Sequence, residues 1–305
     1  MSKTVLVTGA TGKQGGAVVA ALIAANPSPP LTILALTRNT DSPSAASLLK
    51  RYPSVKLVAG DFNDSPAIFA AAAQPIWGVF SVQGITPKPS AAVLEEKQGK
   101  AFVDAAVAHG VRHFVYTSAD RGGPGVSETN PSPVAHIASK HRIEEHLKAR
   151  SAEAGMTWTI LRPTMFMENL APGFFGKFCV TAIDIHFSAD TKGRWIACED
   201  IGWFGAQALL EPEKWKGRAV TLAGDEKTKA EMDEVFREKT GQPAPRTYAW
   251  LARAMLLMMG EFRTMFVWLG EGDFDKVSVQ DTRAIYPGMT SLAEWVEKSP
   301  YVAKK

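Results

Sequence analysis

Three glycines near the N-terminus, Gly9, Gly12 and Gly15, follow a short β-branched apolar run and open a helical pattern. Glycine lets the backbone turn tightly and approach a ligand closely, because it has no Cβ atom. A helix that begins in such a turn offers free amides and the positive end of its dipole to an anion. Thr11 and Gln14 also fit a capping box at this helix start. The pattern predicts the binding of a dinucleotide diphosphate; the alternative is a glycine-rich turn without a ligand.

The end of the second apolar run indicates which dinucleotide is bound. Units that prefer NAD usually place an acid there, whereas an arginine accommodates the 2′-phosphate of NADP. Here residues 31–37 are followed by Arg38 and Asn39. The planar guanidinium suits a phosphate, so we expect NADP(H), with a solvated surface cation as the alternative for Arg38. Asp61, after the third run, could accept a hydrogen bond from the adenine amino group or cap the next helix.

A second group of residues could carry acid–base chemistry. Ser118 ends an apolar run, and His136 and Lys140 follow on a helix expected after the Pro-Ser-Pro at 131–133. The i, i+4 spacing places His136 and Lys140 on one helical face, aimed at the same crevice. Histidine changes its protonation near neutral pH, so His136 could donate a proton. The alternative for His136 is a purely structural role.

Strand patterns and helical patterns alternate along the first half of the chain. Strands are expected at 4–8, 31–37, 55–59, 77–82, 111–118 and 157–161, with helical patterns between them, the clearest at 91–108. Strands that alternate with helices imply right-handed crossovers and a mainly parallel sheet. The fold class that we predict is α/β, a Rossmann-type doubly wound parallel sheet with a smaller, mainly helical C-terminal domain.

After Pro163 the pattern becomes less regular. A strand at 219–222 and helices near 201–210 and 228–239 are expected. We predict an NADP(H)-binding domain over 1–163 and a smaller substrate or partner domain over 164–305. Segments at about 195–223 are expected to return to the first sheet.

The segment 246–269 is rich in methionine and tryptophan. Methionine often fills irregular cores, so the plain prediction is a core or inter-helix face. The sharper alternative is a hydrophobic pocket or a partner surface. Arg253, Glu261 and Arg263 interrupt the segment and argue against a membrane helix.

Composition excludes several classes of protein. The 305 residues suffice for about two domains of ~150 residues, and 46% apolar with 21% charged residues is ordinary soluble usage. The longest apolar run, 17–25, is far short of the ~18 residues that span a bilayer. Two cysteines cannot form a disulfide framework. We therefore expect a cytoplasmic protein, with the nucleus as a second location, and no membrane association.

Other kinds of site are disfavoured. A net charge of +3 and scattered lysines and arginines make nucleic-acid binding improbable. His136, His141 and His146 are five residues apart and do not share a helical face, so we predict no metal site. No G-x-S-x-G nucleophile elbow is present.

Taken together, these motifs resemble the NmrA-like group of atypical short-chain dehydrogenase/reductases. The resemblance covers most of the chain and rests on residues 8–15, 37–39, 60–61, 95–100, 113–118, 136–140, 161–170 and 200–202. It implies cofactor contacts at Gly9, Thr11, Gly12, Lys13, Gln14, Gly15, Arg38, Asp61, Phe62, Val82, Gln83, Lys97, Lys140, Pro163 and Phe166.

One departure from the wider superfamily bears on activity. Ordinary short-chain reductases carry Tyr-x-x-x-Lys, and their tyrosine delivers the proton; here His136 stands at the tyrosine position while Lys140 and Ser118 are kept. By a small margin, the absent donor favours an NADP(H)-sensing regulator with a protein partner and little dehydrogenase activity. The alternative is an NADPH-dependent reductase of a small aromatic, quinone, imine or enone substrate, with Lys140, and His136 beside it, as acid or base. Either would be a monomer or a homodimer.

Overall fold

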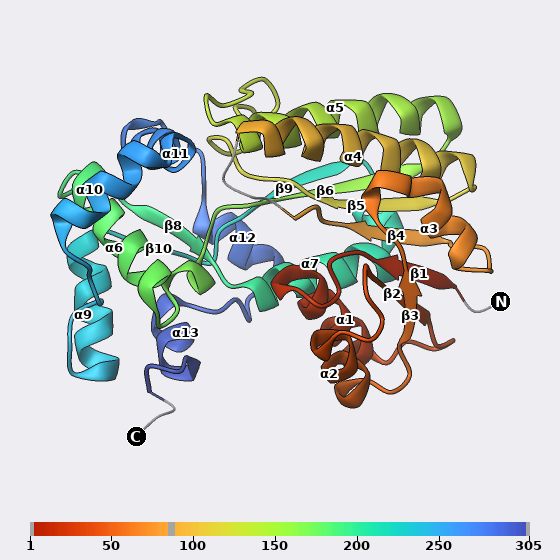
Figure 1. Cartoon of the computed structure of the whole chain (residues 1–305), viewed down its shortest axis with the longest axis horizontal. Coiled ribbons are helices and arrows are strands. Elements are labelled where there is room, and N and C mark those ends of the chain that lie inside the picture. The colour runs from red at the N-terminus through yellow and green to blue at the C-terminus, as the bar shows by residue number, and fades with distance from the viewer. Residues whose placement is uncertain (1–2, 85–88, 303–305) are drawn as a thin grey trace.

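The alternating apolar runs form one parallel sheet in the computed structural model, which describes residues 3–84 and 89–302 (Figure 1). Within these ranges the sheet has seven strands, in the spatial order β3 (Lys56–Ala59), β2 (Thr32–Thr37), β1 (Thr4–Val7), β4 (Gly78–Ser81), β5 (His113–Thr117), β6 (Thr157–Pro163) and β9 (Arg218–Leu222). The strand order reverses at β1, between β2 and β4, and ligands of such sheets bind at the carboxyl ends of the strands beside this reversal. The predicted doubly wound α/β fold is confirmed, and each predicted strand lies within two residues of its observed limits.

Helices cover both faces of this sheet (Figure 1). One face carries α1 (Lys13–Ala25), α2 (Pro43–Arg51) and α7 (Cys198–Leu210). The other carries α3 (Ser65–Ala71), α4 (Pro89–Ala108) and α5 (Ala135–Ala154). Short elements complete this part of the chain, namely the 3-10 helix η1 (Phe62–Asp64) and α8 (Pro212–Trp215). Because both faces are covered, the strands are nearly continuous apolar runs, as expected for a parallel sheet.

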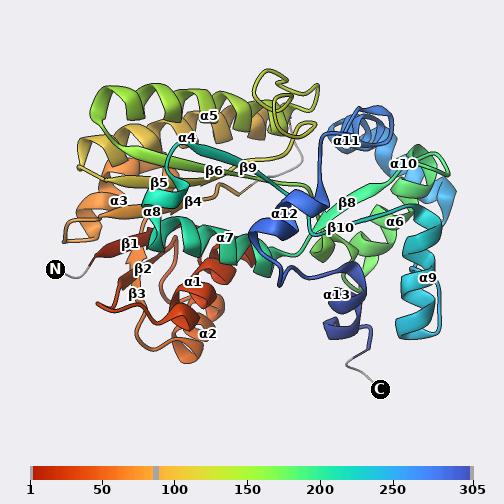
Figure 2. The same cartoon turned by 180° about the vertical axis from the view of Figure 1, so that it is seen from behind.

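The remaining elements form a second group, most of which surrounds a separate hydrophobic core (Figure 2). They include a three-stranded sheet, in the order β10 (Asp225–Lys227), β8 (Gly193–Ile196) and β7 (Met165–Phe166). The helices are η2 (Met167–Leu170), α6 (Phe174–His186), α9 (Lys229–Thr240), α10 (Ala249–Met258), α11 (Gly260–Glu271), α12 (Val279–Ile285) and α13 (Leu292–Lys298). The sequence did not indicate the small sheet, because strands of two to four residues are too short to show a period.

The methionine- and tryptophan-rich segment folds into α10 and α11. Phe266 of α11 is buried in the second core, as the plain prediction required. On α10, by contrast, Trp250 and Met258 are 68% and 79% exposed. Ala252 and Leu256 of α10 are buried in the same core, so both helices supply core residues and α10 also carries an exposed apolar surface. No helix in the described ranges is long and apolar enough to cross a membrane.

A buried histidine at the start of β5 predicts a pH-dependent stability. Burial, reinforced by the charge of Lys3, lowers the pKa of His113 to about 4, and Thr157 Oγ1 lies 2.8 Å from its Nδ1. Because the folded pKa is below the ordinary 6.5, the stabilisation is complete above pH 6.5 and is lost as the pH falls towards 4. We expect a loss of about 2 kcal/mol between pH 7 and pH 5 from this group.

The variant His113→Asn, which cannot be protonated, tests this expectation. Its free energy of unfolding in urea should lie below that of the wild type at pH 7 and approach it at pH 5. A difference between the two proteins that stays constant over this range would show that His113 is not the titrating group.

Candidate active site

The glycine turn connects β1 to α1 and presents backbone rather than side chains. Gly9 has a φ of +58°, and the Gly12 amide donates to the Gly9 carbonyl at 2.8 Å. Gly12 precedes the first residue of α1, and no side chain caps this helix end. A Cβ atom on Gly15 would lie 2.3 Å from the Thr8 carbonyl oxygen, so only glycine lets the helix start this close to the strand. The first amides of α1 are therefore free of side-chain partners, as an anion site requires.

The capping box expected at Thr11 and Gln14 is wrong. The helix begins one residue later than that pattern assumes, with Gly12 in the capping position. The Gln14 Oε1 atom instead accepts a hydrogen bond from the Thr117 hydroxyl at 2.7 Å. The Lys13 ammonium reaches the Glu168 carbonyl at 3.3 Å. Gln14 thus ties the start of α1 to the end of β5 and places its amide at the carboxyl edge of the sheet.

Two of the residues predicted to contact the adenosine half, Arg38 and Asp61, follow the carboxyl ends of β2 and β3, further along the same sheet edge. Arg38 follows β2, is exposed, and makes no hydrogen bond or ion pair with another described residue. Asp61 accepts from the Asn63 amide at 2.8 Å and caps η1, so the capping alternative is the one observed. Phe62 packs edge-to-face on the core ring of Phe102. Lys97 is exposed on α4.

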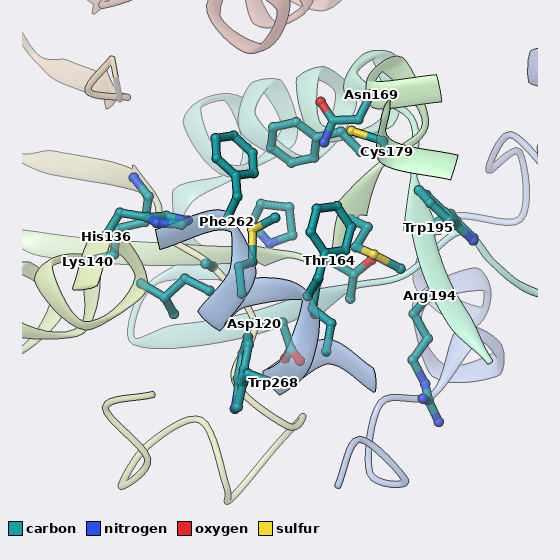
Figure 3. A pocket seen from close by; sticks show the side chains of 18 of the residues that line it. Asp120, His136, Lys140, Thr164, Asn169, Cys179, Arg194, Trp195, Phe262 and Trp268 are labelled. Atoms are coloured by element: carbon teal, nitrogen blue, oxygen red, sulfur yellow. The ribbon is translucent and has the colours of Figure 1, made fainter. Parts of the chain in front are cut away.

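A cavity of about 470 Å³ lies between the carboxyl edge of the larger sheet and the second group of elements (Figure 3). It brings together eight of the predicted site residues: Gln14, Val82, Gln83, Ser118, His136, Lys140, Pro163 and Phe166. The opposite wall is mainly aromatic and comes from α6, β8, α11 and the turn after α11: Phe175, Phe187, Trp195, Phe262, Phe266, Trp268 and Phe274. This volume and lining suit an apolar molecule of moderate size. The pocket alternative for part of the segment 246–269 is therefore confirmed.

Lys140 enters the cavity wall as half of a buried ion pair. Its ammonium lies 2.6 Å from Glu95 Oε1, and the second carboxylate oxygen of Glu95 accepts from the Ser139 hydroxyl at 2.6 Å. Lys140 is 6% exposed and Glu95 2%. The pair fixes the lysine at the cavity edge, so any ligand hydroxyl that Lys140 binds must share the ammonium with Glu95.

His136 is held from the other side of the cavity. Its Nδ1 lies 2.7 Å from Glu261 Oε1, and the same oxygen accepts from the His136 amide at 3.0 Å. With Nδ1 engaged by a carboxylate, the imidazole orientation is fixed and Nε2 is the nitrogen left for a ligand. Figure 3 shows His136 and Lys140 next to one another at the same side of the cavity.

Neither carboxylate partner was recognised as functional from the sequence. Glu95 stood only within a motif of the resemblance, and Glu261 only as a charge that excluded a membrane helix. Their partners lie 45 and 125 residues away along the chain. No local spacing rule connects residues at such separations, so the pairs emerge only from the fold.

Ser118 lies at the end of β5 beside a buried network of charges. Its hydroxyl accepts a hydrogen bond from Arg121 at 3.4 Å. Arg121 and Arg162 both bind the carboxylate of Glu144, and all three are fully buried. Arg162 thus braces the sheet edge and does not line the cavity.

A cysteine in the cavity wall is chemically inactive. Burial raises the pKa of the Cys179 thiol to about 12, although the charge of Lys13 opposes the shift. The nucleophilic form of cysteine is the thiolate, which is therefore essentially absent at neutral pH. The raised pKa therefore argues against covalent catalysis by this sulfur.

The chain combines a glycine turn typical of dinucleotide-binding sheets with an aromatic cavity at the carboxyl edge. A model of the NmrA-like family matches residues 1–296, and the chain belongs to this family. Among its relatives is the NmrA-like family domain-containing oxidoreductase hkm9 of Aspergillus hancockii. The two are 30% identical over 261 residues, which are 80% of this chain and 74% of the relative.

Solved structures agree in fold. The Citrobacter sp. triphenylmethane reductase complexed with NADP(H) superposes with a TM-score of 0.74 at 19% identity, over 97% of this chain and 99% of that chain. The negative transcriptional regulator NmrA in complex with NADP superposes with a TM-score of 0.67 at 18% identity, over 97% and 95% of the two chains. The same architecture thus occurs in a reductase and in a regulator, and the fold alone does not distinguish the two functions.

Proposed function

We propose that the chain binds NADP(H) and is an NADPH-dependent reductase of an apolar aromatic substrate. The observation that carries this proposal is the cavity, which runs from Gln83, Ser118 and Lys140 to the aromatic side chains of α6 and α11. A regulator that only senses the cofactor does not need an apolar space of about 470 Å³ beside the expected nicotinamide position.

The residues present fit the cofactor. The glycine turn is a cradle that a Cβ atom on Gly15 would fill, and its free amides suit the diphosphate. The Gln83 Oε1 atom is buried without a partner among the described residues, and it lines the cavity. An unsatisfied buried acceptor suits the carboxamide amino group of a nicotinamide. Lys140 is the candidate for the ribose hydroxyls.

Arg38 provides a test of the cofactor assignment. Arg38→Ala should weaken NADPH by roughly 10- to 100-fold, the range for a charge-assisted hydrogen bond, because the 2′-phosphate loses its guanidinium partner. NADH has no such phosphate, and its affinity should change by less than about twofold. Calorimetric titration of both coenzymes measures the two changes, and equal losses would rule out this role for Arg38.

NADPH, when bound, supplies a hydride to the substrate. A neutral quinone, carbonyl or imine then also needs a proton, and His136 is placed to donate it from Nε2 while Glu261 holds Nδ1. A cationic acceptor, such as a triphenylmethane carbocation, is neutralised by the hydride and needs no proton. The absence of a tyrosine at position 136 is therefore compatible with reduction.

This difference between substrates makes the proposal testable. Purified protein with NADPH is assayed against a quinone, an enone, an aromatic aldehyde and a triphenylmethane cation, in the wild type and in His136→Gln. We expect kcat for the neutral acceptors to fall by about 10²-fold, the usual contribution of a positioned acid, and for the cation to change little. His146→Gln is the matched control, because His146 lies on the same helix but pairs with Asp104 at the surface.

A regulatory function is the second candidate, and a specific observation favours it. Lys140 and His136 are both bound to carboxylates, Glu95 and Glu261, and the His136 contact links α5 to α11. A cofactor that altered this link in one redox state would shift the balance between two conformations. NADPH binding without turnover of any acceptor, together with protease sensitivity that differs between NADP⁺ and NADPH, would favour the regulator.

A further inference from the structure

Arg194 of β8 is a mostly buried cation that lacks a close acidic partner. Its side chain is 16% exposed, and its Nε atom is buried without a hydrogen bond to any described residue. One Nη atom donates to the Lys192 carbonyl at 3.2 Å. The other lies 3.8 Å from Asp275, whose side chain is 95% exposed, so this contact is long and screened by water.

Three other arginines show how this chain satisfies a guanidinium. Arg121 and Arg162 each make two hydrogen bonds to Glu144, at 2.7 to 3.2 Å. Arg246 binds Asp184 and Asp233 in the same manner. A guanidinium withdrawn from water is costly unless a carboxylate or similar anion binds it. Arg194 is mostly withdrawn from water too, but its carboxylate contact, to Asp275, is long and exposed.

The position of Arg194 indicates where such an anion would come from. Arg194 lines the same cavity as His136 and Lys140, and Figure 3 shows it on the opposite side. Trp195 and Phe187 belong to the apolar part of the lining. A second cation, Lys192, also lines the cavity but already has Glu226 at 2.8 Å. This side of the cavity therefore carries two cations, of which Lys192 has a close carboxylate and Arg194 has only the long contact to Asp275.

We infer that Arg194 binds an oxyanion on the substrate, a carboxylate or a sulfonate carried by its aromatic part. The inference rests on the proposed function for its substrate, but it makes a separate claim about binding. The aromatic body lies against the apolar wall, the anion meets the Arg194 guanidinium, and the reducible centre faces Ser118 and Lys140. Two oxygens of a carboxylate or of a sulfonate can accept hydrogen bonds from the guanidinium fork at once, which makes arginine more selective here than a lysine.

Two probes with the same ring system distinguish the contribution of the charge to binding from that of the ring. Anthraquinone-2-sulfonate carries the anion, whereas 2-(hydroxymethyl)anthraquinone has the same ring system and no charge. Binding of each probe is measured by calorimetry without cofactor and again with saturating NADP⁺. The wild type is expected to bind the sulfonate at least about tenfold more tightly, the lower range for a charge-assisted contact. NADP⁺ should not displace it, because the two occupy different positions.

Variants of the two cavity cations assign the preference to one residue. Arg194→Met should remove the tenfold preference and change the affinity for the neutral probe by less than about threefold, since the apolar volume is retained. Arg194→Lys keeps the charge and should retain part of the preference, which guards against a folding defect in the methionine variant. Lys192→Met is the matched control and should retain the preference, because that ammonium already has its own partner, Glu226.

Several results would overturn the proposed role of Arg194. Equal wild-type affinity for the probes, equal weakening of both by Arg194→Met, loss of preference in Lys192→Met, or no binding of the sulfonate would each overturn it. Displacement by NADP⁺ would also overturn it, since the sulfonate would then lie in the phosphate turn. NADPH oxidation is measured separately. A sulfonate preference without turnover would retain the Arg194 site and reject the reductase, and turnover of the neutral probe without a preference would do the reverse.

Discussion

Replacing Gly15 by alanine is expected to weaken NADPH binding at least roughly 100-fold, the loss of two charge-assisted hydrogen bonds of about 1.5 kcal/mol each. The added methyl group would lie 2.3 Å from the Thr8 carbonyl oxygen and 2.4 Å from that of Gly9. Both atoms are backbone, so the start of α1 must move away from β1. The amides that would face the diphosphate move with it. Calorimetric titration with NADPH measures the loss.

Gly16→Ala is the matched control for this prediction. It lies one residue further along the same helix, and its Cβ would be 3.2 Å from the Ala10 carbonyl oxygen, a contact that a small shift relieves. We expect its NADPH affinity to stay within about threefold of the wild type, because alanine is favoured over glycine in a helix by roughly 0.5–1 kcal/mol. Wild-type affinity in Gly15→Ala would exclude the turn as the diphosphate site.

Glu144→Ala is expected to lower the free energy of unfolding by about 3–5 kcal/mol, the usual cost of breaking a buried ion pair from one side. Glu144 is fully buried and binds both Arg121 and Arg162. Burial alone would raise the pKa of Glu144, but hydrogen bonds from the two arginines hold it below its ordinary value. Without the carboxylate, Arg162 keeps Glu128, whereas Arg121 keeps no acidic partner among the described residues.

Urea unfolding at pH 7 measures this loss, and Glu145→Ala provides the control. Glu145 is the next residue on α5, and its carboxylate is exposed and pairs with Lys148 at the surface. Such pairs contribute between 0 and about 1 kcal/mol, so the control should unfold close to the wild type. Equal stabilities of the two variants would mean that the buried network does not hold the sheet edge together.

The turn and the sheet could be predicted because their signals are local. The strands recur as apolar β-branched runs, and the glycines at 9, 12 and 15 follow the first run at once. A parallel sheet requires crossovers, and the intervening helical patterns supply them. The order of strands and helices along the chain therefore predicts most of the seven-stranded sheet and the helices that cover it.

The cavity could be predicted only in part. Ser118, His136 and Lys140 follow from the resemblance, but Glu261 and Arg194 acquire their positions from long-range packing. The sequence pattern shows that α11 is apolar, yet not that Phe262 and Phe266 face the sheet edge while Trp250 of α10 stays exposed. Short strands such as β7 and β8 show no periodicity in the sequence. The direction of the Arg194 side chain depends on β8, so it could not be predicted.

His136, which stands in place of the tyrosine, contacts Glu261, and this contact bears on both candidate functions. His136, whose Nδ1 binds Glu261, keeps Nε2 for a substrate, and the proposed reductase uses this nitrogen as its proton donor. The same contact spans α5 and α11, and the regulatory alternative assigns the cofactor-dependent change in conformation to it. Activity assays distinguish the two functions more directly than affinity does.

Transfer of a labelled hydride from NADPH to a substrate would show reduction by this chain itself. The protein is mixed with NADPH deuterated at the transferable C4 position and with a triphenylmethane cation, and the product is examined by mass spectrometry. Reduction in the cavity predicts one deuterium on the central carbon of the colourless product, and loss of this labelling in Gly15→Ala. NADPH that binds tightly but is oxidised by neither this cation nor the quinone, enone and aldehyde would contradict the account and leave the chain as a cofactor-binding regulator.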